Sequence, residues 1–110
     1  MKSWDLTGID VEPHQPEVIT STDDARAIVI QLPAGEALQE HEVHERALVT
    51  IVAGEAKVTT PAGESVDAKA GHLFEFDPKE RHEVAAKSDT RLLLVLTPWP
   101  GDGHPSQVSG

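Results

Sequence analysis

The sequence predicts one small all-β domain, either a barrel or a sandwich. At 110 residues the chain can bury a single core but hardly a second one. Short apolar runs rich in Val, Ile and Leu recur along it without the 3.6-residue repeat of a helix, and Gly and Pro separate them. We therefore expect strands at Glu17–Thr20, Ala25–Leu32, Arg46–Ala53, Glu55–Thr60, Glu64–Ala68, His72–Phe76, His82–Ala86 and Thr90–Thr97.

The chain divides into three parts along its length. Residues 1–24 should form an N-terminal arm and the first strands, and residues 25–97 the barrel itself. The strand Ala25–Leu32 ends at Pro33-Ala34-Gly35, where proline sets φ and glycine allows a positive φ. Residues 98–110 are rich in Pro and Gly and can continue neither a strand nor a helix, so we expect an extended tail.

The later strands are predicted from their turns and from one apolar run. Arg46–Ala53 and Glu55–Thr60 have the pattern of antiparallel strands joined around Gly54. In the final strand every residue of Leu92–Leu96 is aliphatic, so this strand should be buried on both faces, either at the centre of a sheet or at a subunit interface. The other turn signals are Pro61-Ala62-Gly63, Ala70-Gly71 and Asp77-Pro78.

The composition excludes several classes of function. The chain has no Cys, so a disulfide framework, a thiolate metal site and a Cys nucleophile are excluded. A formal net charge of −10 disfavours nucleic acids and anionic lipid surfaces as partners. The aliphatic run Leu92–Leu96 is far shorter than the roughly 18–20 residues that cross a bilayer. Because the first residues lack the pattern of a secretory signal, we expect a cytoplasmic protein.

Two histidines stand in a regular frame of glycines. Gly35, His41 and Gly54 are in register with the first motif of the cupin superfamily, and Gly71 followed by His82 reproduces the second. The chain therefore resembles a small, single-domain cupin of the RmlC-like type over roughly residues 30 to 96. This resemblance implies a double-stranded β-helix, or jelly-roll barrel, with a site in its mouth. Since cupins are often dimeric, it also implies a homodimer.

The first of these motifs is degenerate. The family places a second metal-binding His and a metal-binding Glu at positions that here hold Val43 and Ala47. In the second motif, Asp77, Lys79 and Ala86 stand where the family has Pro, Gly and Asn. The resemblance therefore supports the scaffold more strongly than the metal centre.

The candidate metal ligands are His41, His44 and His82, with Glu45 as a weaker fourth. Three imidazoles and a carboxylate would suit Mn, Fe, Co, Ni, Cu or Zn, whereas His41 and His82 alone would bind such metals poorly. The set is complete only if a turn swings His44 or Glu45 inward. In the alternative, residues 44–46 form an exposed charged bend, His41 and His82 are bonded to backbone or water, and the protein holds no metal.

Strand parity predicts the lining of a pocket in the barrel. Residues at alternate positions face the same side of a strand, so Val43, Ala47, Val49 and Ile51 should form an apolar lining.

Two functions remain open. One is a cupin that binds a small molecule in this apolar pocket, for sensing or storage, with a weak or degenerate metal site. Val43 and Ala47 favour it because apolar groups make the mouth a better hydrophobic pocket than a cation site. The alternative is a divalent-metal-dependent dioxygenase, isomerase or decarboxylase acting on a small organic substrate, as the resemblance implies. The sequence names neither the ligand nor a catalytic residue.

Overall fold

The computed structural model describes residues 1–41 and 45–97, with the side chains of residues 39–41 excepted. In this part of the chain all the regular structure is β-strand, and no helix is long and apolar enough to cross a membrane. The strands are β1 (Glu17–Ser21), β2 (Arg26–Leu32), β3 (Ala37–His41), β4 (Arg46–Ala53), β5 (Glu55–Thr59), β6 (Ser65–Lys69), β7 (Leu73–Phe76), β8 (His82–Ala86) and β9 (Thr90–Thr97).

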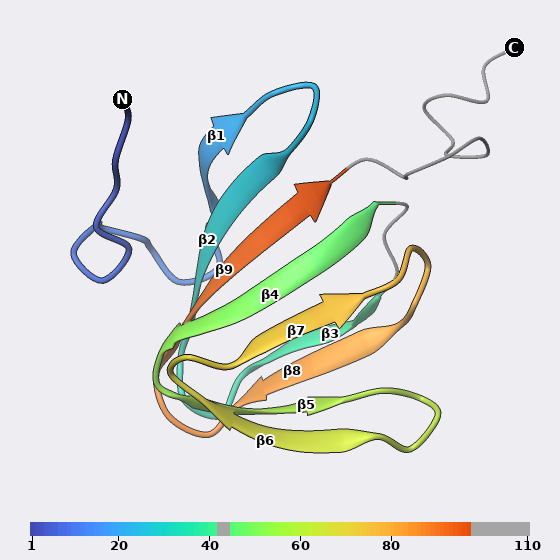
Figure 1. Cartoon of the computed structure of the whole chain (residues 1–110). Coiled ribbons are helices and arrows are strands. Elements are labelled where there is room, and N and C mark those ends of the chain that lie inside the picture. The colour runs from blue at the N-terminus through green and yellow to red at the C-terminus, as the bar shows by residue number, and fades with distance from the viewer. Residues whose placement is uncertain (42–44, 98–110) are drawn as a thin grey trace, which may run out of the picture.

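The strands form two antiparallel sheets that face each other (Figure 1). One sheet has five strands in the order β1-β2-β9-β4-β7, and the other has four in the order β3-β8-β5-β6. Strands that are distant in sequence therefore become neighbours, because β9 lies between β2 and β4, and β8 lies between β3 and β5. This crossed arrangement of two sheets is typical of a jelly roll, and it confirms the predicted all-β fold.

One observed strand, β3, is not predicted by the sequence. Its residues, Ala-Leu-Gln-Glu-His, include none of the β-branched or aromatic types that favour strands. Pairing with β8 therefore decides its conformation. The other strands match the predicted ones to within one residue at either end.

Alternation along the strands builds the core. In β4 the residues Ala47, Val49 and Ile51 are buried, while the residues between them are only partly buried. The buried face points toward the four-stranded sheet, so side chains from both sheets join one cluster. Its members are Leu32, Ala47, Val49, Ile51, Ala56, Val58, Ala68, Phe76, Val84, Ala86 and Leu92.

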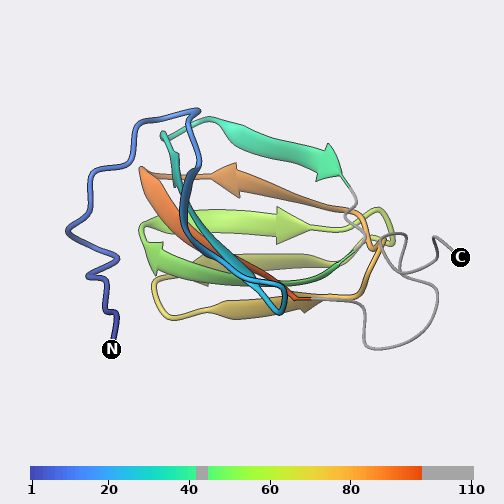
Figure 2. The same ribbon diagram turned by 90° about the horizontal axis from the view of Figure 1, so that it is seen from above.

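The last strand, β9, lies at the centre of its sheet, which is one of the two places the sequence allows for it. Leu92 faces the core, and its neighbour Arg91 faces the outside. There the N-terminal segment lies against the sheet, because Arg91 Nη1 donates to the carbonyl oxygens of Leu6 at 3.0 Å and Ile9 at 2.8 Å. Figure 2 shows this segment at the end of the molecule where β3 begins.

The two ends of the barrel differ in how the chain turns there. At the closed end the chain turns at residues 53–55, between β4 and β5, and at residues 87–89, between β8 and β9. A Cβ atom at Gly54 would stand 2.1 Å from the carbonyl oxygen of Asp89, and Gly54 has a φ of +88°, so this turn needs glycine. At the opposite end, the mouth, β7 ends and residues 77–81 lead into β8.

Candidate functional site

His82 lies inside the barrel at its mouth. It begins β8, in which His82, Val84 and Ala86 are buried and the residues between them are partly buried. The residue is 3% exposed, and a buried polar ring is stable only with polar contacts. Its Nδ1 lies 3.4 Å from the carbonyl oxygen of Glu80. In the tautomer that donates from Nδ1, Nε2 is the atom able to accept a hydrogen bond or ligate.

An aromatic row fixes the plane of the His82 ring. The imidazole stacks on Phe76, with centroids 3.9 Å apart and planes 8° from parallel. Phe76 is followed by Phe74 at 6.2 Å, and Phe74 by His72 at 5.6 Å. His72 is exposed and lies at the opposite end of the row, so the structure does not bring it to His82.

A β-bulge pairs the backbone of His41 with that of His82. Leu38 keeps the regular register with β8, but the next pair is His41 with His82, so β3 carries one extra residue at positions 39–40. Without the bulge, Glu40 would stand opposite His82. Bulges are frequent beside functional sites because they change which residue meets the partner strand.

A pocket of about 110 Å³ opens beside His82, between the two sheets. Six of its lining residues are aliphatic, and the imidazole of His82 is the one polar side chain among the described residues that line it. The lining residues are Ile30, Leu38, Val49, His82, Val84, Leu92 and Leu94.

Three of the four predicted lining residues fall in the described part of the chain. Val49 lines the pocket, whereas Ala47 and Ile51 are buried on the same face of β4 in the adjoining core. Val43 lies outside the described residues. Strand parity in β2, β8 and β9 is the signal that could have found more of the lining, because residues at alternate positions share a face, as Val84 does with His82 and Leu94 with Leu92. The residues that sequence reasoning missed are Ile30, Leu38, Val84, Leu92 and Leu94.

The described side chains do not assemble a metal centre. Among them, no three His, Asp or Glu residues lie close enough to share an ion. Ala47 stands where the resemblance places a carboxylate, and it is buried with only a methyl group to offer. Glu45 is partly buried just before β4. Since the side chain of His41 and all of His44 lie outside the described part, a site made by His41, His44 and His82 stays a prediction.

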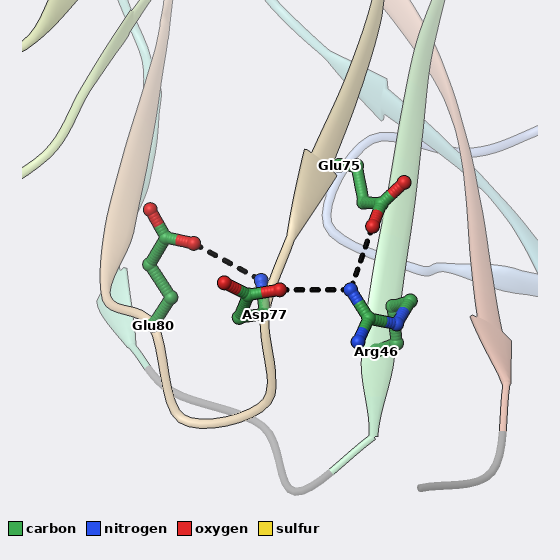
Figure 3. A network of polar contacts seen from close by, with 4 residues as sticks. All are labelled: Arg46, Glu75, Asp77 and Glu80. Carbon is green, nitrogen blue, oxygen red and sulfur yellow. Dashed lines mark hydrogen bonds and ion pairs between the residues drawn. The ribbon is translucent and has the colours of Figure 1, made fainter. Parts of the chain in front are cut away.

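Outside the pocket, Arg46 links β4 to the end of β7 (Figure 3). Its Nη1 donates to Oε2 of Glu75 at 2.6 Å and to Oδ1 of Asp77 at 2.8 Å. The bond to Asp77 is the main cause that raises the pKa of Arg46, with a further contribution from Glu75 against an opposing effect of desolvation. The backbone N–H of Asp77 donates to Oε1 of Glu80 at 3.0 Å, so the network extends along the turn that leads to His82.

Comparisons with known proteins agree with this architecture. The family model described as "Cupin domain" matches residues 28–98, well over half of the chain. The comparison with curated proteins finds no match.

Three solved structures illustrate the similarity. A conserved protein of unknown function from Streptococcus pyogenes is 24% identical, with a TM-score of 0.74 over 91% of this chain and 90% of that chain. An RmlC-like cupin from Desulfovibrio desulfuricans is 18% identical, with a TM-score of 0.79 over 89% and 97%. A cupin superfamily protein from Desulfitobacterium hafniense is 19% identical, with a TM-score of 0.75 over 86% and 87%. At these identities the similarity shows the fold and leaves the ligand open.

Proposed function

We propose that this chain, which belongs to the cupin family, binds a small and largely apolar molecule inside its barrel, without turning it over. The pocket beside His82 is the observation that supports this most. Concave sites lined by apolar side chains with few polar groups are the usual form of a small-molecule site. Among the described lining residues only His82 could serve in acid–base chemistry, so binding for sensing or storage fits the lining better than catalysis.

The walls of the pocket are held in place by the sheet. Ile30 is paired with Leu92, and Val49 with Leu94, across neighbouring strands. Such a pocket exists before the ligand arrives, so little ordering is needed on binding. A ligand that binds only the folded state adds about 2.7 kcal/mol to the free energy of unfolding at a concentration of 100 times its Kd.

Blocking the pocket tests the proposal. Val49→Phe places a ring in the lining, and Leu73→Phe is the matched control because Leu73 is 60% exposed on β7. Small apolar compounds are added to each protein, and the methyl NMR signals of the Leu and Val residues are followed. We expect shifts at Leu92 and Leu94 in the native protein and in the control, and none in Val49→Phe.

Equal shifts in both variants would contradict the proposal. If Val49→Phe does not fold, Val49→Leu serves as the milder substitution, with a smaller loss of binding expected.

A divalent-metal-dependent cupin enzyme, a dioxygenase, isomerase or decarboxylase, is the second candidate. The observation in its favour is the bulge that pairs His41 with His82, the two histidines of the glycine frame. Elemental analysis of untagged protein, beside His41→Ala, His44→Ala and His82→Ala, tests it. Stoichiometric metal that these substitutions remove would favour the enzyme, and substoichiometric metal in all four proteins would rule it out.

We also propose a homodimer, as the resemblance implies. Light scattering at high micromolar concentration tests it, and a mass equal to that of one chain would contradict it.

A further inference from the structure

Another hollow lies on the outer side of the four-stranded sheet, at the closed end of the barrel. Its volume is about 250 Å³, and it is open to solvent. Along β5 and β6 its charged residues alternate with the buried Ala56 and Ala68, so their side chains point away from the core. The described residues that line the hollow are Glu55, Asp67, Ala68, Lys69, His72 and Lys87.

The formal charges of this hollow cancel. Lys69 and Lys87 supply two positive charges, and Glu55 and Asp67 supply two negative ones. An anion placed there would meet two carboxylates, and a metal ion would meet two ammonium groups. A ligand with charge of one sign is therefore opposed by half of the charged lining, whereas a ligand with one charge of each sign finds a partner for both.

One pair of opposite charges in the hollow is already closed. Lys87 Nζ donates to Asp67 Oδ1 at 2.6 Å, and this bond is the main cause that lowers the pKa of Asp67, so the carboxyl group is ionised at neutral pH. Because β5 lies between β8 and β6, the bond draws the Lys87 side chain across β5. This ion pair therefore forms one side of the hollow.

The second pair of opposite charges is open. Glu55 and Lys69 are direct cross-strand partners in the antiparallel pair of β5 and β6, a position in which opposite charges attract each other. Over the described ranges, neither the Glu55 carboxylate nor the Lys69 ammonium group forms an ion pair or a side-chain hydrogen bond. Both groups are thus available to a ligand, and the pairing of their strands fixes the distance between their backbones.

His72 borders the hollow beside Lys69. Its N–H donates to the carbonyl oxygen of Lys69 at 3.0 Å, and its ring stacks on Phe74 with planes 17° from parallel. The ring is therefore oriented by its neighbours, while the residue stays exposed. A ring nitrogen can accept from an ammonium group or donate to a carboxylate, according to the tautomer.

We infer that this hollow binds a small zwitterion, the chemical class of the free α-amino acids, with the carboxylate of the ligand on Lys69 and its ammonium group on Glu55. The site is separate from the pocket beside His82, so this inference does not depend on the proposed function. Because its contacts are exposed to solvent, we expect weak binding, with a Kd on the order of 1 mM.

Three probes that differ in charge test the class of ligand. Glycine carries both charges, N-acetylglycine only the carboxylate, and glycinamide only the ammonium group. Each is titrated into the native protein while the backbone amide NMR signals of Glu55, Lys69 and His72 are followed, with sodium chloride at equal concentration as the control for screening. We expect glycine to bind with a Kd of about 1 mM, and the other two probes to bind at least about tenfold more weakly.

Variants that remove one charge assign the two contacts. Lys69→Gln and Glu55→Gln should each weaken the binding of glycine at least about fivefold, because each leaves one charge of the ligand without its partner. Lys57→Gln and Glu17→Gln are the matched controls. They make the same changes of charge at exposed residues that do not line the hollow, and they should leave the affinity within about twofold of the native value.

Exchanging the two charges is a sharper test. Glu55→Lys alone, or Lys69→Glu alone, places two like charges opposite each other and should abolish the binding of glycine. The two substitutions together restore one charge of each sign, and glycine, which has no side chain, can bind in the reverse orientation. We expect the double variant to recover an affinity within about fivefold of the native one.

The inference is wrong if glycine shifts none of these signals at about 100 mM, or if N-acetylglycine or glycinamide binds as tightly as glycine. It is also wrong if Lys57→Gln weakens binding as much as Lys69→Gln does. A double variant that fails to bind glycine would contradict recognition through two opposite charges. None of these outcomes affects the proposed function, because the pocket beside His82 lies inside the barrel.

Discussion

The closed end and the mouth of the barrel are held by different kinds of bond. At the closed end, side chains bond to backbone, from the buried Thr90 and from the exposed Ser88 and Asp89. The Thr90 hydroxyl lies 2.9 Å from the carbonyl oxygen of Glu55 and 2.8 Å from that of Ser88, and the Ser88 hydroxyl accepts from the N–H of Glu55 at 3.0 Å. Asp89 accepts from the N–H of Ala34 at 2.9 Å. These contacts fix both turns against each other.

The mouth is joined mainly by exposed side chains and contains a strained residue. Arg46 reaches Glu75 and Asp77 across the surface, where ion pairs contribute little to stability. Lys79 has a φ of +67°, which a residue with a Cβ atom adopts only at a cost. The comparison indicates that the closed end supplies much of the rigidity, while the mouth tolerates strain beside the candidate site.

The largest expected effect is that of Gly54→Ala at the closed end. The added methyl group would meet the carbonyl oxygen of Asp89, and φ is already positive, so we expect the free energy of unfolding to fall by more than about 3 kcal/mol. Gly63→Ala is the matched control, because Gly63 has a φ of +95° but no atom within 4 Å of the added Cβ. In chemical denaturation, Gly63→Ala should lower the free energy of unfolding by only about 1–2 kcal/mol. Equal losses of stability in Gly54→Ala and Gly63→Ala would contradict the steric explanation.

Next in size is Thr90→Val, a substitution of similar shape at a residue that is 0% exposed. It removes the hydroxyl donor shared by the carbonyl oxygens of Glu55 and Ser88, although the Glu55 oxygen still accepts from the N–H of Lys87, so we expect a loss of about 1–2 kcal/mol in urea denaturation. Arg46→Gln at the mouth should lower the free energy of unfolding by a smaller amount, because the ion pairs of Arg46 are exposed to solvent. A larger loss of stability for Arg46→Gln than for Thr90→Val would mean that the bonds at the mouth contribute more to stability than those at the closed end.

A stabilising change is expected at the mouth. The N–H of Glu80 donates to the carbonyl oxygen of Asp77 at 3.0 Å, so Lys79 is the third residue of a turn that needs a positive φ there. Lys79→Gly should therefore raise the free energy of unfolding by about 1 kcal/mol. Lys79→Ala keeps the strain and should bring no comparable gain. The resemblance also places Gly at this position, and thermal denaturation of the two variants provides the measurement.

The smallest expected effect concerns pH and an exposed pair on the four-stranded sheet. Lys87 Nζ donates to Asp67 Oδ1 at 2.6 Å, and this bond lowers the pKa of Asp67 below 3.8. Because the folded-state pKa is below the unfolded one, the stabilisation is present above about pH 3.8 and is lost as the pH falls through the folded value. Lys87→Met should thus be slightly less stable than the native protein near neutral pH.

The difference between Lys87→Met and the native protein should vanish in acid, and Asp67→Asn should show the same pH dependence. Denaturant titrations over a pH series give the measurement. A difference that is constant across the series would mean that the pair does not stabilise the fold.

Much of the fold could be predicted because its signals are local. Short apolar runs and the Gly and Pro residues between them predicted every strand but β3, whose residues have little strand preference of their own. The candidate site was less predictable. Val49 belongs to a strand in which every second residue faces the core, so its place could be predicted. Leu38 lines the pocket only because β3 pairs with β8.

The sequence by itself determined the strands other than β3, the glycine turns and the spacing that relates His41 to His82, since each depends on residue type and spacing along the chain. The tertiary structure decided what surrounds His82. Only the closing of two sheets brings Ile30, Leu38 and Leu94 to one pocket, and only the bulge in β3 gives His41 in place of Glu40 as the partner of His82. These are contacts between distant parts of the chain, and their free energy depends on neighbours that spacing alone does not specify.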